Sequence, residues 1–392
     1  MTLRRVCWEG EFAGRRNGRL SSPDRCLGAA LVELSEVAAG KVGSVIKSIE
    51  INGFRGIQHG KVEGLAPLTV VVGASGHGKS TILEALYIAC APQVGLALQQ
   101  MAQRRRMGDP GRWLFWKGDG NRGADLTLSR LDDGMRKVKL SIGRVDRVSN
   151  GSPMSPRDLQ AQDLASHGHP PPYECVYGMS DHEFGGFALL AGDGAGTWGD
   201  EGPRTADPGG EAAFLQSFRP RAEMSRLYSE ASIKQLRSKI DAWLTPAIPG
   251  YQQLESLTDS QNRPVLFLHA ENRAVPVEAA GDGIMALVRT VLELATIPQK
   301  LCLLEDPEVH QHPAAMGQSA KAMVAAVRSG MQLILTTHSL ELIDSLLGEL
   351  GAERGVKAAV ITTRLVDGEL RTAVRTGESL ERARFELDQD LR

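Results

Sequence analysis

The stretch PLTVVVGASGHGKSTILEAL, residues 67–86, decides the fold. The apolar residues 68–72 predict a buried strand, and the apolar positions that follow Thr81 predict a helix. Between them lies the phosphate-loop pattern G-x-x-x-x-G-K-[ST], known as Walker A. It is filled by Gly73, Ala74, Ser75, Gly76, His77, Gly78, Lys79 and Ser80.

This loop has the residue types that triphosphate binding requires. Its glycines let backbone N–H groups turn toward phosphate oxygens, and the helix that follows directs its positive end at the anion. We expect Lys79 to reach the β and γ phosphates and the Ser80 hydroxyl to hold Mg²⁺. The sequence therefore predicts that residues 73–81 bind ATP together with Mg²⁺.

A second motif, LCLLEDPEVHQHP, occupies residues 301–313. Its apolar run is typical of a central parallel strand, and Glu305 and Asp306 stand where that strand ends. In an open α/β sheet this end lies beside the phosphate crevice. We expect Glu305 to hold Mg²⁺ and Asp306 to polarise the attacking water, although acids after strands are also common loop residues. His310 and His312 are read as the end of the loop rather than as metal ligands.

A third motif, MQLILTTHSLELI, occupies residues 331–343 and predicts a strand, a short turn and a helix. His338 stands in the turn. It can donate a hydrogen bond between a γ-phosphate and the attacking water. A histidine at a strand end is more often structural, but the other two motifs favour the catalytic role.

These segments, together with residues 46–64 and GDGIMALVRTVLEL (281–294), resemble the ATPase domain of the AAA15 or overcoming-lysogenization-defect (OLD) family. That family is grouped with ABC-type ATPases of the SMC and RecF kind, and the resemblance covers residues 45–90 and about 214–392. It implies an α/β P-loop NTPase fold in which a mixed central sheet is flanked by helices and interrupted by an inserted lobe. It also implies an ATP-dependent homodimer whose nucleotide is contacted in trans by Gly281, Asp282 and Gly283. A plain glycine turn before a core helix is the alternative.

The chain departs from this family in three places. His77 stands in the phosphate loop where a small residue is usual. Most relatives have Asp-Glu or Glu-Glu where this chain has Glu305 and Asp306, which puts the rate of hydrolysis in doubt. Only 54 residues follow His338, which we consider too few for the Toprim nuclease domain of the OLD enzymes.

We predict four parts of the chain. They are a poorly ordered extension over 1–43, an ATPase part with Walker A over 44–100, an inserted lobe over 101–213, and a second ATPase part over 214–392. In the lobe we expect a hairpin over 124–145 and long Gly/Pro-rich loops over 151–210. After the lobe, one periodic helix is expected to carry Ile233 through Leu244.

Residues 101–122 combine six basic side chains with three aromatic ones. Such a segment can bind phosphates and stack bases, which suggests DNA contact through residues 104–122, but a solvated basic face beside core aromatics is equally compatible. The residues are Arg104, Arg105, Arg106, Arg112, Lys117 and Arg122, with Trp113, Phe115 and Trp116.

Composition favours a soluble cytoplasmic protein. The net charge of −2 over 392 residues gives no bulk attraction to nucleic acid. The five cysteines are scattered without C-x-x-C spacing, so neither a disulfide framework nor a zinc site is predicted. No signal peptide or membrane span is expected.

Two functions remain open. The first is an ATP-hydrolysing dimerisation switch that serves phage defence or DNA transactions with a separate effector. The second is a RecF-like, nucleotide-gated DNA-binding repair module with little turnover.

Overall fold

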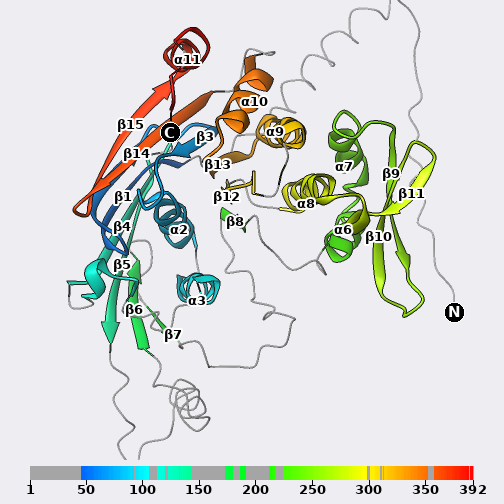
Figure 1. The fold of residues 1–392 in the computed structure, drawn as a ribbon. Helices are drawn as coiled ribbons and strands as arrows, with labels where there is room; N and C mark the ends of the chain where they lie inside the picture. Colours follow the sequence, from blue (N-terminus) through cyan, green and yellow to red (C-terminus); the bar gives the residue numbers. More distant parts are fainter. Residues whose placement is uncertain are drawn as a thin grey trace, which may run out of the picture. The chain divides into compact units, whose positions relative to one another are not determined.

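Five parallel strands form the centre of the main sheet in this computed structural model. It describes residues 46–91, 94–105, 113–119, 122–131, 133–143, 173–179, 186–190, 212–216, 224–297, 301–309, 311, 313–351, 357–387 and 389–391. The central strands lie in the order β14–β3–β13–β12–β8 (Figure 1). Their bounds are β3 Leu68–Val72, β8 Ala212–Gln216, β12 Leu301–Glu305, β13 Gln332–Thr336 and β14 Ala358–Val366.

Neighbouring strands in this group pair in parallel. Every residue of β3 and β13 is buried, as expected for strands that are covered on both faces. The carboxyl ends of β3, β12 and β13 therefore share one edge, where their loops can form a single site.

Antiparallel strands extend the sheet beyond this centre. Within the described residues the full order is β7-β6-β5-β4-β1-β2-β15-β14-β3-β13-β12-β8. A mixed sheet flanked by helices confirms the predicted α/β fold class. The additional strands are β1 Ile46–Phe54, β2 Ile57–Glu63, β4 Ala124–Arg130, β5 Met135–Gly143, β6 Tyr173–Met179, β7 Gly186–Leu190 and β15 Glu369–Thr376.

Helices cover both faces of the central strands. Leu301 and Leu303 of β12 belong to a core that includes α2 (Lys79–Cys90) and α3 (Val94–Arg105). Cys302 and Leu304 belong to a second core with α9 (Pro313–Arg328) and α10 (Leu340–Gly351). Alternate residues of one strand thus enter opposite cores, as the two-residue period of a strand requires.

A third core joins helices to a small separate sheet, ordered β11-β10-β9. Its elements are α6 Met224–Ile233, α7 Arg237–Leu244, β9 Tyr251–Thr258, β10 Pro264–Ala270, β11 Arg273–Pro276, the short 3₁₀ turn η5 Val277–Ala279 and α8 Asp282–Thr296.

The single helix predicted across Ile233 to Leu244 is wrong. Gln235 has a left-handed φ of 58°, which ends α6 before α7 begins. Ile233, which was expected on the apolar face, is 83% exposed.

The segment before these helices also differs in part from expectation. The hairpin over 124–145 is confirmed as the antiparallel pair β4 and β5. Long loops were predicted over 151–210, but β6 and β7 lie there and lengthen the main sheet from β5. The predicted boundaries of the inserted lobe stay a prediction, and the extension 1–43 lies outside the described residues.

The basic and aromatic segment is only partly described. Phe115 is 1% exposed and forms a β-bridge with Phe54, so it is a core residue and not a platform for bases. Trp116 begins a 3₁₀ turn (η2, Trp116–Gly118) and packs against Gly368 in the turn between β14 and β15. Trp113 is 55% exposed. Arg106 and Arg112 lie outside the described residues, and Arg104 and Arg105 are described only as backbone in α3.

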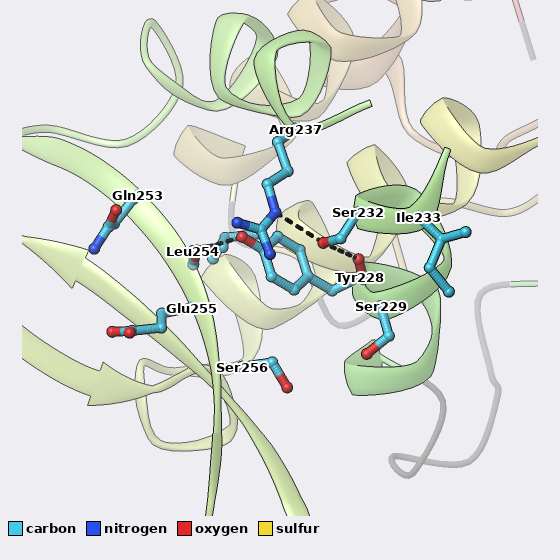
Figure 2. A pocket seen from close by; sticks show the side chains of 9 residues that line it. All are labelled: Tyr228, Ser229, Ser232, Ile233, Arg237, Gln253, Leu254, Glu255 and Ser256. Carbon is cyan, nitrogen blue, oxygen red and sulfur yellow. Dashed lines mark hydrogen bonds between the residues drawn. The ribbon is translucent and has the colours of Figure 1, made fainter. Parts of the chain in front are cut away.

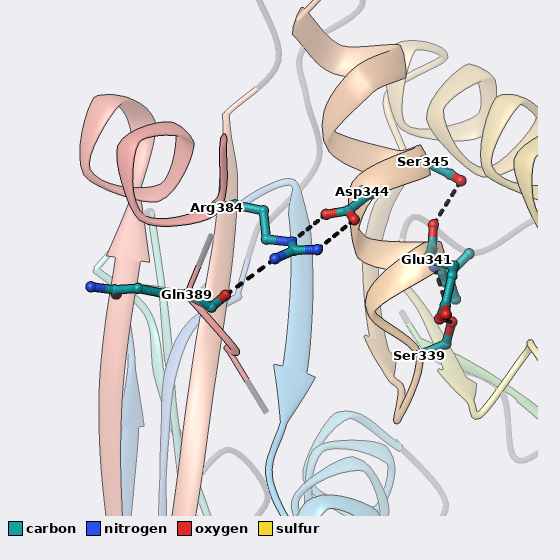
Figure 3. A network of polar contacts seen from close by, with 7 residues as sticks. Ser339, Glu341, Asp344, Ser345, Arg384 and Gln389 are labelled. Atoms are coloured by element: carbon teal, nitrogen blue, oxygen red, sulfur yellow. Dashed lines mark hydrogen bonds and ion pairs between the residues drawn. The ribbon is translucent and has the colours of Figure 1, made fainter. Parts of the chain in front are cut away.

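The last described segment packs onto α10. It contains α11 (Gly377–Glu381) and the π-helical turn η6 (Arg382–Glu386), and Leu380 and Ala383 enter the core that α10 shares. The Arg384 guanidinium donates to both carboxylate oxygens of Asp344 on α10, at 2.5 and 2.8 Å (Figure 3). Across the described part of the chain, none of the helices has the length and apolar character needed to cross a bilayer.

Candidate functional site

The phosphate loop joins β3 to α2 through three glycines with positive φ. These are Gly73 at 146°, Gly76 at 81° and Gly78 at 86°. A Cβ on Gly73 would lie 2.5 Å from the carbonyl oxygen of Thr363 on β14, so a side chain is excluded there. Gly78 is the N-cap of α2. The loop therefore places its own backbone and the start of α2 together at the edge of the sheet where β3 ends.

Lys79 is buried inside this loop, with 6% of its surface exposed. Its Nζ donates to the carbonyl oxygens of Gly73 at 2.8 Å and Ala74 at 3.2 Å. Burial lowers the pKa of Lys79, whereas the charges of Asp306 and Glu308 act in the opposite direction. The carboxylates of Asp306 and Glu308 are therefore within electrostatic range of the Lys79 ammonium.

The rest of the predicted loop surrounds this lysine. Ala74, Ser75 and Gly76 are exposed, Ser80 is half-buried and Thr81 is 8% exposed at the first turn of α2. His77 is half-buried, and its Nδ1 lies 3.2 Å from the carbonyl oxygen of Thr363. The unusual histidine of the loop thus contacts β14.

The acidic turn follows β12 directly. Glu305 is the last residue of the strand and pairs in register with Thr336 of β13. Asp306 has a φ of 42°, a left-handed conformation that is uncommon for residues other than glycine. Its N–H donates to the carbonyl oxygen and the hydroxyl of Thr336, at 3.2 and 3.1 Å. The Thr336 hydroxyl in turn donates to Asp306 Oδ1 at 2.9 Å, which fixes the carboxylate.

His338 stands in the turn between β13 and α10, with an exposed side chain. Ser339 starts the helix that follows, because its hydroxyl oxygen accepts a hydrogen bond from the N–H of Leu342 at 3.1 Å. The same hydroxyl donates to Glu341 at 2.8 Å (Figure 3). The histidine turn follows β13, which lies between β3 and β12 in the sheet. It therefore lies beside the acidic turn, at the edge that also carries the phosphate loop.

Glu308 is a site residue that the sequence reasoning did not assign. Its Oε1 accepts a hydrogen bond from the backbone N–H of His338 at 2.7 Å. Its Oε2 is buried and has no hydrogen-bond partner among the described residues. The sequence signal for it is a third carboxylate two residues after Asp306.

The glycine turn predicted to act in trans begins α8. Gly281 has a φ of 95° and open space where a Cβ would stand, and Asp282 is exposed as the first residue of the helix. A Cβ on Gly283 would lie 3.2 Å from the Cβ of Ala315 on α9, so Gly283 faces its own chain. No hydrogen bond or ion pair among the described residues joins this turn to the phosphate loop.

The residues present fit a bound Mg²⁺ at the phosphate loop. A hydroxyl at Ser80 and a carboxylate at Glu305 are the oxygen donors that this ion takes alongside phosphate oxygens. The described residues contain no group of three or more His, Cys, Asp or Glu side chains arranged to hold a metal on their own. His310 and His312 lie outside them.

A pocket of about 380 Å³ lies in another part of the molecule, between α6, the start of α7 and β9 (Figure 2). The Arg237 guanidinium lies over the Tyr228 ring at 5.3 Å and donates from Nε to the Ser232 hydroxyl at 2.9 Å. Tyr228 in turn donates to the carbonyl oxygen of Leu254 at 2.5 Å. The pocket contains none of the residues of the three motifs. It is lined by Tyr228, Ser229, Ser232, Ile233, Arg237, Gln253, Leu254, Glu255 and Ser256.

Known proteins resemble this chain in the segments that carry the motifs. Residues 48–98, with the phosphate loop, match the family model described as an AAA domain. Residues 215–343, with the acidic turn and His338, match the model described as an AAA ATPase domain. The uncharacterized protein MJECL11 of Methanocaldococcus jannaschii is 28% identical over 113 residues, which are 29% of this chain and 98% of that protein.

Solved structures that this chain is similar to include SMC head domains. The SMC head bound to the C-winged helix domain of ScpA is 14% identical, with a TM-score of 0.49, over 86% of this chain and 99% of that one. The SMC head domain from Thermotoga maritima is 13% identical, with a TM-score of 0.43, over 85% and 99%. The two family matches carry the functional conclusion: both segments that contain the motifs are similar to AAA-type ATPase domains, which supports a nucleotide-binding ATPase.

Proposed function

We propose that this protein binds and hydrolyses ATP, and that ATP closes two copies of it into a dimer that hydrolysis reopens. One observation carries the proposal: the phosphate loop, the acidic turn and the histidine turn follow three adjacent parallel strands, β3, β12 and β13. Their side chains thus meet at the edge where open α/β sheets bind ligands. The family matches of both segments support the ATPase part of this proposal.

In the proposed reaction, different residues of the chain have different roles. The loop N–H groups and the Lys79 ammonium bind the β and γ phosphates. Asp306, held by Thr336, orients a water for in-line attack on the γ-phosphorus and accepts its proton as ADP leaves. The exposed His338 side chain donates to the γ-phosphate. Bound Mg²⁺, held by Ser80 and Glu305, would neutralise charge on the phosphate oxygens.

The dimer is proposed because the glycine turn leaves the start of α8 exposed. Gly281 and Asp282 are exposed at the start of α8, where bare N–H groups and a positive helix end can receive a phosphate. Because no hydrogen bond or ion pair within the described ranges joins this turn to its own phosphate loop, we infer that it completes the site of a second subunit. A separate effector would then recognise the closed dimer, in the manner of a phage-defence switch.

A second function, a nucleotide-gated DNA-binding repair module with little turnover, is favoured by the order of the acids. Asp306 reaches one methylene less far than the glutamate usual at the water-side position, which weakens its contact with water. Trp113 is exposed, and the Lys117 ammonium lies 5.3 Å from the Trp116 ring, so part of the basic segment can meet a nucleic acid.

Turnover of ATP, measured with and without double-stranded DNA, separates the two. A switch of the first kind hydrolyses ATP without DNA, in a reaction that Lys79→Ala abolishes. The second kind binds ATP and DNA together, and its turnover stays near background. An absence of ATP binding by the full chain, with Mg²⁺ present, would contradict both.

A further inference from the structure

The structure assigns Glu308 a role in the ATP site: we propose that it is a positioning residue that ties the histidine turn to the acidic turn. This inference rests on the proposed ATPase function, because it concerns the same site. It assigns a role to a further residue of the second motif, and it identifies a mechanical link between the acidic turn and the histidine turn.

The link consists of one short hydrogen bond over a long sequence separation. Glu308 Oε1 accepts from the N–H of His338 at 2.7 Å, across 30 residues. A charged acceptor makes this bond stronger than one between neutral groups. The Asp306 bonds to Thr336 form a second link between the same two turns, so the acidic turn holds the segment 336–338 at both ends.

The carboxylate also lies within electrostatic reach of the phosphate loop. Its charge, together with that of Asp306, counteracts the effect of burial on Lys79. Its second oxygen, Oε2, is buried and has no hydrogen-bond partner among the described residues. A buried acceptor that has no hydrogen-bond donor costs stability unless a bound ligand or water donates a hydrogen bond to it.

Glu308 therefore couples the position of the histidine turn to that of the acidic turn. With Glu308 in place, the backbone at His338 is fixed relative to Asp306, and the histidine side chain projects from a defined position. Without it, one of the two hydrogen-bonded links described between these turns is lost, and the His338 backbone is held less firmly relative to Asp306. ATP binding, which depends on Lys79 and the loop, is not expected to change.

The test compares Glu308→Ala with Glu308→Gln in the full chain. The glutamine amide oxygen can still accept the His338 N–H, whereas alanine cannot. We expect Glu308→Ala to lower kcat about 10- to 100-fold with KM and ATP affinity within about threefold of wild type, and Glu308→Gln to recover most of the rate. The exposed carboxylate of α11 gives a matched control, Glu381→Ala, which should leave kcat unchanged.

A second readout does not depend on turnover. Hydrogen exchange of the His338 amide should be at least about 10-fold faster in Glu308→Ala than in wild type, and close to wild type in Glu308→Gln. Wild-type protein that does not hydrolyse ATP but shows this exchange pattern would refute the ATPase function and leave the link standing. Unchanged exchange in Glu308→Ala, or equal loss of kcat in the alanine and glutamine variants, would overturn the positioning role.

Discussion

Asp306 and Thr336 hold each other across the ends of β12 and β13. The Asp306 N–H donates to the Thr336 carbonyl oxygen at 3.2 Å, and the Thr336 hydroxyl donates to Asp306 Oδ1 at 2.9 Å. The hydroxyl bond fixes the carboxylate in the left-handed turn. The orientation of the proposed catalytic acid thus depends on a buried threonine of the neighbouring strand.

Thr336→Val should therefore slow hydrolysis without weakening ATP binding. Valine keeps the shape and the backbone carbonyl but loses the donor to Asp306. We expect kcat to fall about 10-fold and the free energy of unfolding to fall by about 1–2 kcal/mol. Steady-state kinetics and urea denaturation measure the two effects. Thr372→Val, the same change at an exposed hydroxyl on β15, should alter neither, and a wild-type kcat in Thr336→Val would show that the bond does not orient Asp306.

Lys79→Ala should abolish ATP binding, because the ammonium is the only cationic side chain of the loop. We expect the dissociation constant for ATP to rise at least about 100-fold, measured by isothermal titration with Mg²⁺ present. Lys61→Ala removes an exposed lysine that is paired with Glu63 and should bind ATP as wild type does. Wild-type affinity in Lys79→Ala would contradict the assignment of the phosphate loop.

Substitutions of Glu305 and Asp306 should have different effects, one on Mg²⁺-dependent ATP binding and the other on hydrolysis. Asp306→Asn keeps the bond from Thr336 but cannot take a proton, so we expect turnover to fall at least about 100-fold with ATP affinity retained. Glu305→Gln should weaken ATP binding only when Mg²⁺ is present. Binding titrations with Mg²⁺ and with EDTA distinguish the two variants. Equal loss of both properties in both variants would refute this division of roles.

Local patterns predicted the centre of this fold, because each motif joins a strand to a turn over a few residues. The strands around Val70, Leu303 and Ile334 are buried on both faces, and continuous apolar runs predict this. The bond between Glu308 and His338 could not be predicted in the same way, since it depends on which strands become neighbours. Composition was misleading at β6 and β7, where Gly- and Pro-rich surroundings conceal two strands. Periodicity was misleading at Gln235, whose left-handed φ ends α6 and leaves no mark on the apolar pattern.

The ion pair between Arg384 and Asp344 should stabilise the fold from outside the site (Figure 3). It is bidentate, and the arginine side chain is only 12% exposed, so the pair is screened less than an ordinary surface pair. We expect a double-mutant cycle with Arg384→Ala and Asp344→Ala to give a coupling energy of about 1 kcal/mol, measured by urea denaturation. The exposed pair Arg382 and Glu386 is a control and should couple more weakly. A coupling energy near zero for Arg384 and Asp344 would mean that apolar packing alone holds this segment on α10.

The last prediction concerns assembly. If the glycine turn completes the site of a second subunit, ATP trapped by Asp306→Asn should convert monomers into dimers, which light scattering with and without ATP would detect. The turn itself must be blocked with care, because a bulky residue at Gly283 would collide with Ala315 and disturb the packing of α8 on α9. Asp282 is exposed, so Asp282→Trp in the trapped variant should prevent dimerisation while ATP affinity stays within about threefold of the trapped parent.

Glu278→Trp, a matched change at an exposed site in the preceding turn, controls for bulk alone and should still allow ATP to drive dimerisation. A mass that stays monomeric with ATP would show that the glycine turn is only the start of a core helix. A dimer that forms equally well without ATP, or in Asp282→Trp, would place the interface elsewhere on the molecule. In either case the nucleotide site would act within one subunit, and ATP would have to signal through the turns that carry Asp306 and His338.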